Sequence, residues 1–241
     1  MNITKVLGVS SAIAVSFMVS APAFAAGGGG NGGGGGGAGC GVQEQNGNGT
    51  VFYVPTGGNV RNGSTNILGW GNGTGGNRST YAGLLRSVAQ QCVLVAAATT
   101  ANSGSGTDVQ SAVNQARQRF GNLVGGNPKV CTGGHSQGGG GAFNAANRLN
   151  APCVIGLQPD TVFTVRIMRP VAANVDVACI FSTGDVLAPA QPSNLTNCRR
   201  NSNPARFQNR TTAGTHFTPV SGTGGAPGAA FRDFVQQFLL R

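Results

Sequence analysis

Short apolar runs recur along the chain and predict the strands of a sheet. Residues 49–55 form a β-branched and aromatic run that ends at a proline, and residues 65–70 form the next run. Four more apolar runs follow, at residues 92–98, 130–132, 153–157 and 175–181. The first of these four is continuous, which is typical of a strand buried on both faces.

Apolar positions with helical spacing separate these runs. They predict helices over residues 81–88, 107–120 and 142–149, and an apolar stripe predicts a last helix over residues 229–241. An early hairpin of the first two strands, followed by strands that alternate with helices, indicates an α/β fold with a mostly parallel central sheet. We expect the last helix to cover one face of that sheet.

The first residues have the pattern of a leader rather than of a folded domain. Lys5 precedes an apolar stretch, and Ala23-Phe24-Ala25 fits a cleavage site, so residues 1–25 predict a secretory signal peptide. Residues 26–39 are nearly pure glycine and predict a flexible tether, because they cannot bury a core. One domain is expected over residues 40–241, in a secreted (extracellular or periplasmic) protein. No later run is long enough to predict a membrane anchor.

Cysteine content adds covalent links to this picture. The chain has six cysteines, and with an export signal they predict three disulfides. The six positions are Cys40, Cys92, Cys131, Cys153, Cys179 and Cys198. About 15 pairings are possible, and the sequence does not choose among them. No Cys-x-x-Cys pair occurs, and with only two histidines in the chain no metal site is expected.

Charge raises the question of an anionic partner. The chain has 16 Lys and Arg against 6 Asp and Glu, and loss of Lys5 with the signal would reduce the net charge from +10 to +9. Such an excess can favour anionic surfaces or nucleic acid. The densest cluster consists of Arg199, Arg200, Arg206 and Arg210. It contains one aromatic residue and matches no nucleic-acid-binding motif, so we interpret it as a solvated basic face and expect no nucleic-acid partner.

Residues 129–141 concentrate the candidate chemistry. A short strand leads into Gly134-His-Ser136-Gln-Gly138, a G-x-S-x-G signature, and a helical pattern follows. In this context the motif places a serine on a strained elbow, with its hydroxyl exposed above the sheet, and its glycines let strand and helix pack closely. We therefore predict Ser136 as a nucleophile. An ordinary glycine-rich loop is the alternative, because so many glycines produce such matches by chance.

A serine nucleophile needs a base, and the base needs an orienting group. Of the two histidines, His135 adjoins Ser136 on the elbow, where neighbouring side chains diverge. His216, on a loop before the last helix, is therefore the predicted base. The acid should lie between serine and base in the chain, which is the order in α/β-hydrolases.

Three carboxylates lie in that interval. Asp176 stands near the start of a strand, at the end of the sheet away from the elbow, and is rejected. Asp185 follows the 175–181 strand and is preferred over Asp160, which follows the preceding strand and stays as the alternative acid. With this fold Cys179 would pair with Cys198, because that bridge would fix the loop that carries Asp185.

Acyl transfer also needs N–H donors for an oxyanion. One should be the backbone N–H of Gln137, directly after the nucleophile. The other should come from residues 72–76, where the N–H of Thr74 is preferred and that of Gly73 is next. The same loop fits G-x-G-x-x-G, but no acidic residue stands about 20 positions further on, so a dinucleotide site is rejected and no cofactor is expected.

Together these motifs resemble those of compact secreted α/β-hydrolases that include bacterial cutinases and poly(ethylene terephthalate) hydrolases. The matching stretches, in the family's order and with comparable spacing, are residues 49–56, 72–74, 134–140, 185–189 and 216–217. The resemblance implies an α/β-hydrolase fold without a large lid, a Ser136–His216–Asp185 triad and ester hydrolysis. It also implies a substrate cleft, for which the candidate residues are Gly73, His135, Asp160 and Phe217.

The sequence departs from this family at positions that bear on substrate. Gln137 replaces a methionine that lines the cleft, and Thr74 replaces an aromatic residue of the oxyanion loop. Near Asp160 and Thr161 no aromatic residue aligns with the tryptophan that stacks on the substrate ring. Loss of these aromatic faces removes the stacking that favours a terephthalate unit. The resemblance therefore implies ester hydrolysis and leaves cleavage of aromatic polyesters open.

Several functions are compatible with these residues. The expected one is a monomeric serine esterase that acts on small-molecule, lipid or polyester substrates. A polyhydroxyalkanoate depolymerase and a feruloyl-type esterase are the alternatives among enzymes. A basic exported binding protein with an idle triad is the alternative from another class, because a fold does not determine a function.

Overall fold

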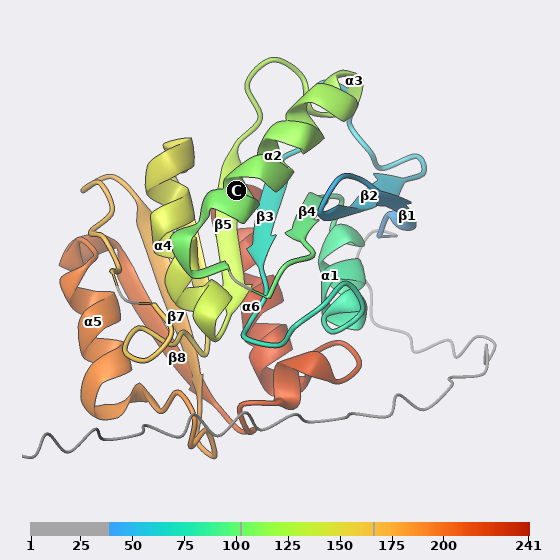
Figure 1. Ribbon diagram of the computed structural model, residues 1–241. Coiled ribbons are helices and arrows are strands. Elements are labelled where there is room, and N and C mark those ends of the chain that lie inside the picture. Colours follow the sequence, from blue (N-terminus) through green and yellow to red (C-terminus); the bar gives the residue numbers. More distant parts are fainter. Residues whose placement is uncertain (1–38, 102, 166) are drawn as a thin grey trace, which may run out of the picture. The chain divides into compact units, whose positions relative to one another are not determined.

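A computed structural model describes residues 39–241 except residues 102 and 166. The predicted signal peptide and all but the last residue of the predicted tether lie outside the described residues. The described residues belong to one compact unit. Within it, an eight-stranded sheet lies between two layers of helices (Figure 1). Among the described residues, no helix is both long and apolar enough to cross a membrane.

The sheet is mostly parallel, as predicted. Its strands are Gly41–Asn46 (β1), Thr50–Thr56 (β2), Ile67–Gly71 (β3), Leu94–Ala98 (β4), Val130–His135 (β5), Cys153–Leu157 (β6), Asp176–Ser182 (β7) and Phe207–Thr212 (β8). They lie in the order β1-β2-β4-β3-β5-β6-β7-β8. The β1–β2 and β2–β4 pairs are antiparallel, and all other pairs are parallel. The carboxyl ends of the six parallel strands therefore meet at one edge.

The early hairpin differs from the prediction. Its two strands are β1 and β2, whereas β3, the expected partner of β2, lies beyond β4. The sequence analysis missed β1 because residues 41–46 are mostly polar. An edge strand is specified by its backbone hydrogen bonds more than by buried side chains, so it gives little hydrophobic signal.

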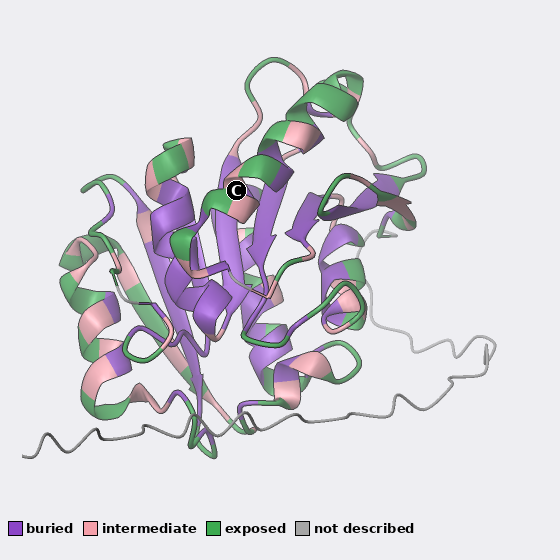
Figure 2. Ribbon diagram, in the orientation of Figure 1, coloured by how far each residue is buried: buried purple, intermediate pink, exposed green. Residues whose placement is uncertain are grey.

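Helices cover both faces of the sheet, and the residues between layers are buried (Figure 2). The helices are Ala82–Ala89 (α1), Thr107–Arg119 (α2), Gly121–Val124 (α3), Gln137–Leu149 (α4), Leu195–Arg200 (α5) and Gly225–Leu239 (α6). Side chains of α1 and α6 share one apolar cluster with one face of the sheet, and those of α2 and α4 share the other. The predicted C-terminal stripe is buried in the first cluster, so α6 is a covering helix as expected.

Three disulfides link the described residues: Cys40–Cys92, Cys131–Cys153 and Cys179–Cys198. The predicted Cys179–Cys198 bridge joins β7 to α5 and closes the segment that contains Asp185. Cys131 and Cys153 are directly paired residues of the neighbouring strands β5 and β6. The carboxyl-end loops are thus attached to a sheet that is itself cross-linked.

Candidate active site

Ser136 lies on a sharp turn between β5 and α4, at the edge where the parallel strands end. Its backbone angles are φ 54° and ψ −121°. For a residue with a side chain this conformation costs on the order of 1–3 kcal/mol and persists only where packing imposes it. Packing is tight here, because a Cβ on Gly138 would lie 2.1 Å from Gly71 O. Ser136 is half-buried, so its hydroxyl is within reach of a ligand.

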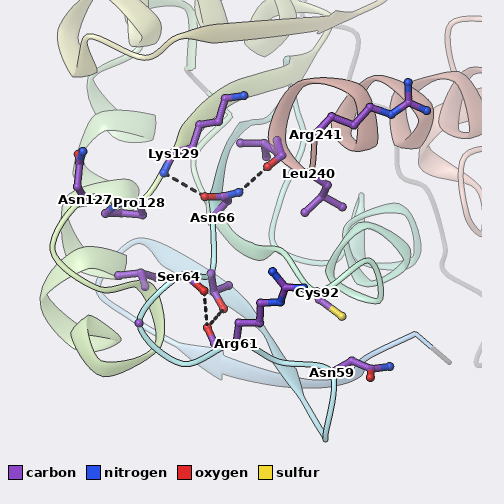
Figure 3. A pocket seen from close by; sticks show the side chains of 14 residues that line it. Asn59, Arg61, Ser64, Asn66, Cys92, Asn127, Pro128, Lys129, Leu240 and Arg241 are labelled. Atoms are coloured by element: carbon purple, nitrogen blue, oxygen red, sulfur yellow. Dashed lines mark hydrogen bonds between the residues drawn. The ribbon is translucent and has the colours of Figure 1, made fainter. Parts of the chain in front are cut away.

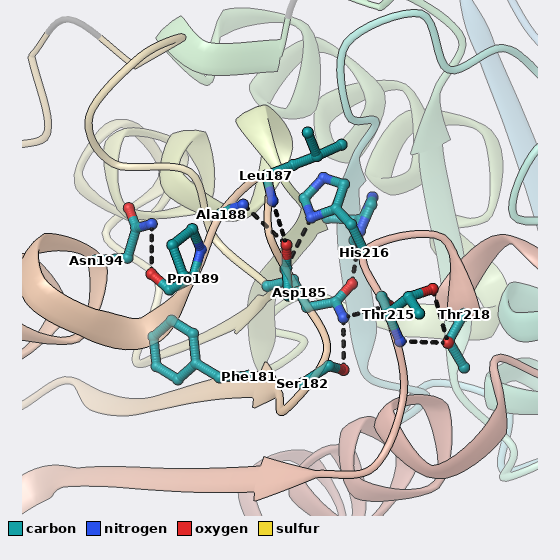
Figure 4. Close-up of polar contacts among 12 residues, drawn as sticks. Phe181, Ser182, Asp185, Leu187, Ala188, Pro189, Asn194, Thr215, His216 and Thr218 are labelled. Carbon is teal, nitrogen blue, oxygen red and sulfur yellow. Dashed lines mark hydrogen bonds and ion pairs between the residues drawn. The ribbon is translucent and has the colours of Figure 1, made fainter.

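His216 and Asp185 form a buried pair on the loops after β8 and β7 (Figure 4). His216 Nδ1 lies 2.8 Å from Asp185 Oδ2, and Asp185 Oδ1 accepts the backbone N–H groups of Leu187 and Ala188 at 2.9 Å each. Burial raises the pKa of Asp185, but the hydrogen bonds from His216 and from these backbone groups outweigh it and hold the pKa below its usual value. Asp185 is therefore ionised at neutral pH, which keeps the proton of His216 on Nδ1 and leaves Nε2 as an acceptor.

Asp160, the alternative acid, forms hydrogen bonds within its own loop instead. Its carboxylate accepts the backbone N–H groups of Val162, Phe163 and Thr164 at 2.9–3.0 Å, and also the Thr164 hydroxyl. Burial raises the pKa of Asp160, but these four hydrogen bonds together outweigh that effect and hold the pKa below its usual value. No hydrogen bond joins Asp160 to His216.

Asp176, the rejected acid, lies where it was expected, at the start of β7. It forms an ion pair with Arg206 at 2.8 Å, at the other end of the sheet from the elbow. Of the three carboxylates between nucleophile and base, the structure brings only Asp185 to His216.

Ser136 and His216, the predicted nucleophile and base, are not hydrogen-bonded to each other. The ring of His135, the residue before Ser136, lies 4.7 Å from the ring of His216, measured between centroids. No described residue accepts a hydrogen bond from the Ser136 hydroxyl. Catalytic contacts are often loose without substrate and tighten when it binds, so this arrangement suits a serine that turns towards His216 Nε2.

The backbone N–H of Gln137 is a spare donor beside Ser136. It belongs to the first turn of α4, where N–H groups have no acceptor within the helix. The helix dipole places partial positive charge at the same point. No described residue accepts this N–H, so it is available to an oxyanion.

The loop after β3 provides a second spare donor, and it is Thr74 rather than Gly73. The N–H of Gly73 donates to Tyr81 Oη at 3.2 Å, and its carbonyl accepts the N–H of Gly76 at 2.9 Å. These bonds fix the peptide group between Gly73 and Thr74, whose N–H has no acceptor among the described residues. The loop runs beside Ser136, because a Cβ on Gly73 would lie 3.0 Å from Ser136 Cβ.

Most of the large exposed apolar side chains among the described residues belong to the segments that follow three of the parallel strands. Six of them follow β6, β7 and β8, and we call them the apolar rim: Val162, Phe163, Ile167, Val186, Leu187 and Phe217. Val186 is 84% exposed and Phe163 is 77% exposed. Of the predicted cleft residues, Phe217 belongs to this rim, whereas Gly73, His135 and Asp160 are buried.

Two polar side chains next to the elbow were missed by the sequence analysis. Gln158 directly follows β6, and Tyr81 directly precedes α1; both are buried and contact the ring of His135. A polar residue at the carboxyl end of a buried strand could have drawn attention to Gln158. Tyr81 gave no such signal, because it occupies an apolar position of the helical pattern.

A pocket of about 590 Å³ lies at the opposite end of the sheet (Figure 3). Its walls come from the segments before β3, β4 and β5 and from the end of α6. The Asn66 side chain links two of these walls, because it accepts the Lys129 N–H and donates to Leu239 O. No His, Asp or Glu lines this pocket. It therefore holds no histidine–carboxylate pair of the kind that His216 and Asp185 form in the carboxyl-end loops.

No protein-family model matches the chain, and comparison with curated proteins gives no match. The geometry of the carboxyl-end loops is thus the basis for a functional assignment.

Proposed function

We propose that this protein is a secreted, monomeric serine carboxylester hydrolase with an α/β-hydrolase fold, similar to bacterial cutinases. The observation that carries the proposal is the buried His216–Asp185 pair next to a strained turn that presents Ser136. Ser136 after β5, Asp185 after β7 and His216 after β8 follow the chain order of α/β-hydrolases. Three disulfides support folding in an oxidising compartment, after removal of residues 1–25.

The reaction would proceed in two acyl transfers. Ser136 Oγ attacks the ester carbonyl carbon while His216 Nε2 takes the hydroxyl proton, and Asp185 stabilises the imidazolium. The carbonyl oxygen becomes an oxyanion that accepts the N–H groups of Gln137 and Thr74. The carbon–oxygen bond to the alcohol then breaks, and the alcohol leaves with the proton from His216.

Water completes the cycle. It attacks the acyl group on Ser136 Oγ while His216 takes one of its protons, and a second oxyanion forms on the same donors. When this intermediate collapses, the bond to Ser136 Oγ breaks and His216 returns the proton to that oxygen. The carboxylic acid is released, and atoms and charges balance over the cycle.

The apolar rim supports esters that are presented on an apolar surface or carry long acyl chains. Between β6 and β7 the described residues form no helix, so no helical lid covers the site there. Aliphatic polyesters, including polyhydroxyalkanoates, and lipid esters fit this surface better than feruloyl esters, because the rim has few aromatic faces for stacking.

The first test is hydrolysis of p-nitrophenyl esters, from acetyl to long acyl chains, by residues 26–241 and by the Ser136→Ala variant. We expect turnover by the wild-type protein that falls to background in the variant at an unchanged melting temperature. The chain-length profile then separates an esterase from a lipase or depolymerase. Equal background rates for both proteins at every chain length would refute general esterase activity and favour the binding protein with an idle triad.

A further inference from the structure

A buried chain of hydrogen bonds starts at the oxyanion loop. The Gly73 N–H donates to Tyr81 Oη at 3.2 Å, and Tyr81 Oη lies 2.8 Å from His135 Nδ1. Tyr81 and His135 are both at least 97% buried. The chain thus passes from the segment that carries Thr74 to the residue that precedes Ser136.

The same chain continues from His135 to the base loop. His135 Nε2 lies 2.9 Å from Gln158 Oε1, and Gln158 Nε2 donates to the Thr215 carbonyl at 2.7 Å and to the Ser182 hydroxyl. Thr215 directly precedes His216. Three segments far apart in sequence therefore meet through Tyr81, His135 and Gln158.

The groups at the two ends of this hydrogen-bond chain, the Gly73 N–H and the Thr215 carbonyl, determine the direction of every hydrogen bond in it. A backbone N–H can only donate and a carbonyl can only accept. Gln158 must therefore turn its NH₂ group towards Thr215 and its oxygen towards His135, so His135 Nε2 carries a proton. In a neutral ring Nδ1 is then an acceptor, and it receives the O–H of Tyr81, whose oxygen in turn accepts the N–H of Gly73.

Electrostatics agrees with this neutral tautomer. Burial lowers the pKa of His135 to about 3, and the neighbouring His216 lowers it as well, against smaller opposite effects of Gln158 and Asp185. A neutral His135 adds no positive charge beside His216, which itself becomes positive during the proposed reaction.

We propose that Tyr81, His135 and Gln158 are positioning residues, which hold the oxyanion loop and the base loop in register with Ser136 through this single chain. The proposal rests on the proposed hydrolase function and gives His135 a role other than lining the cleft. Tyr81 would fix the position of the peptide group that carries the Thr74 N–H. Gln158 would fix the position of the Thr215 backbone, from which His216 follows. Misplacement of a catalytic group by about 1 Å can cost 10²-fold in rate, so such supports matter.

The two tyrosines of the chain provide a matched pair of variants. Both are buried, but Tyr53 Oη has no hydrogen-bond partner among the described residues. We expect Tyr81→Phe to lower kcat by about tenfold, the value of one lost hydrogen bond in the transition state, with KM nearly unchanged. Tyr53→Phe should leave both parameters unchanged. Gln158→Met, which keeps the side-chain length and removes its three hydrogen bonds, should lower kcat at least as far as Tyr81→Phe.

A second readout does not depend on activity. The chain has only two histidines, so ¹⁵N NMR of the imidazoles can be assigned with one variant. Wild-type His135 should show a protonated Nε2 and an unprotonated Nδ1 at neutral pH, and Gln158→Met should lose this single tautomer. A protonated Nδ1 in the wild-type protein would overturn the proposal.

The kinetic and spectroscopic outcomes separate the two proposals. Turnover that is equal in wild type, Tyr81→Phe and Gln158→Met would overturn the positioning role while the hydrolase function stands. An inactive wild-type protein would overturn the hydrolase function and with it the catalytic role of the three residues, although NMR would still show whether the chain of bonds exists.

Discussion

Asp185 and Asp160 are two buried carboxylates that follow neighbouring strands and accept hydrogen bonds from different partners. Asp185 accepts hydrogen bonds from His216 and from two backbone groups. All four hydrogen bonds that Asp160 accepts come from the three residues 162–164. Neutralising the two side chains should therefore affect different properties of the protein.

Asp185→Asn should lower kcat for a p-nitrophenyl ester by about 10⁴-fold, because the amide no longer holds the imidazole in the required tautomer. Asp160→Asn should keep kcat within a few-fold and lower the free energy of unfolding by about 1–3 kcal/mol, since backbone N–H groups lose a charged acceptor. Kinetics and urea unfolding of both variants check this. If the larger loss of kcat occurred in Asp160→Asn, Asp160 would be the acid.

His135 should make folding stability depend on pH. In the folded protein its pKa is about 3, whereas its ordinary value is 6.5. Between these values the unfolded chain binds the extra proton, so stability is complete above pH 6.5 and falls on acidification by up to about 1.4 kcal/mol per pH unit.

Urea unfolding at pH 6.5 and pH 4.5 measures this loss. Over the same interval the free energy of unfolding should fall less in the His135→Gln variant than in the wild-type protein. The difference should equal the effect of the one extra proton that His135 binds in the unfolded chain. Carboxylates such as Asp185 and Asp160 titrate in both proteins and cancel in the comparison. Equal losses in the two proteins would show that His135 takes up its proton in the folded state as well.

At the scale of elements, two of the disulfides constrain different parts of the chain. Cys40–Cys92 spans 52 residues and lies away from the candidate site, whereas Cys179–Cys198 spans 19 residues and closes the segment with Asp185. Chain entropy alone assigns them about 4 and about 3 kcal/mol. Their effects on stability should be similar, and their effects on turnover should not.

The Cys40→Ser/Cys92→Ser double variant should lower the free energy of unfolding by about 2–4 kcal/mol and keep kcat within twofold. The Cys179→Ser/Cys198→Ser double variant should lose a similar amount of stability and also several-fold in kcat, because the acid loop is less well fixed. Denaturant unfolding and ester kinetics on both variants test the contrast. Equal effects on kcat would mean that the second bridge has no part in holding Asp185.

Strands could be predicted from the sequence where both of their faces are buried, because such a strand is a continuous apolar run. Residues 92–98 and 153–157 predicted β4 and β6 for this reason. The edge strand β8, with the sequence Phe-Gln-Asn-Arg-Thr-Thr, was missed like β1, because backbone pairing with a neighbour defines it. The helix after the elbow was expected from residue 142 but begins at Gln137, since its glycines have low helix propensity and only tertiary packing holds them helical.

For the candidate site, chain order and residue type were enough to select the pair that the structure brings together, Asp185 and His216. From the sequence, Thr74 was only preferred over Gly73 as the second oxyanion donor. The choice depends on the Tyr81 hydroxyl, which accepts the Gly73 N–H and leaves the Thr74 N–H without an acceptor. The contact of Gln158 with Thr215 joins segments 57 residues apart. Contacts of this kind arise from the packing of loops, and no local pattern in the sequence indicates them.

At the scale of the whole domain, most large exposed apolar side chains among the described residues belong to the segments after β6, β7 and β8. The apolar rim occupies the edge that carries the candidate site. All six Asp and Glu side chains of the chain, by contrast, accept a hydrogen bond or form an ion pair: Glu44, Asp108, Asp160, Asp176, Asp185 and Asp233. Basic side chains outnumber them, so the net charge of the chain is positive.

Replacement of the rim residues Phe163 and Val186 by serine should reduce hydrolysis of an insoluble aliphatic polyester film several-fold, because apolar area for adsorption is lost. Turnover of soluble p-nitrophenyl acetate should stay unchanged. Leu240→Ser is the matched control, since Leu240 is an exposed apolar residue at the opposite pocket. A parallel fall in both activities would show that the two rim residues act on the catalytic geometry and not on adsorption.

The glycines that open α4 bear on the order in which the molecule assembles. Each costs a helix about 1 kcal/mol relative to alanine, so residues 138–141 do not hold a helical turn on their own. Backbone atoms of β3 and of the loop after β4 hold it instead: Cβ atoms at Gly138 and Gly141 would lie 2.1 and 2.0 Å from the carbonyl oxygens of Gly71 and Ser103. The proposed oxyanion site therefore forms only after the strands have docked. During refolding, secondary structure should return first, and ester turnover should report the last step of assembly.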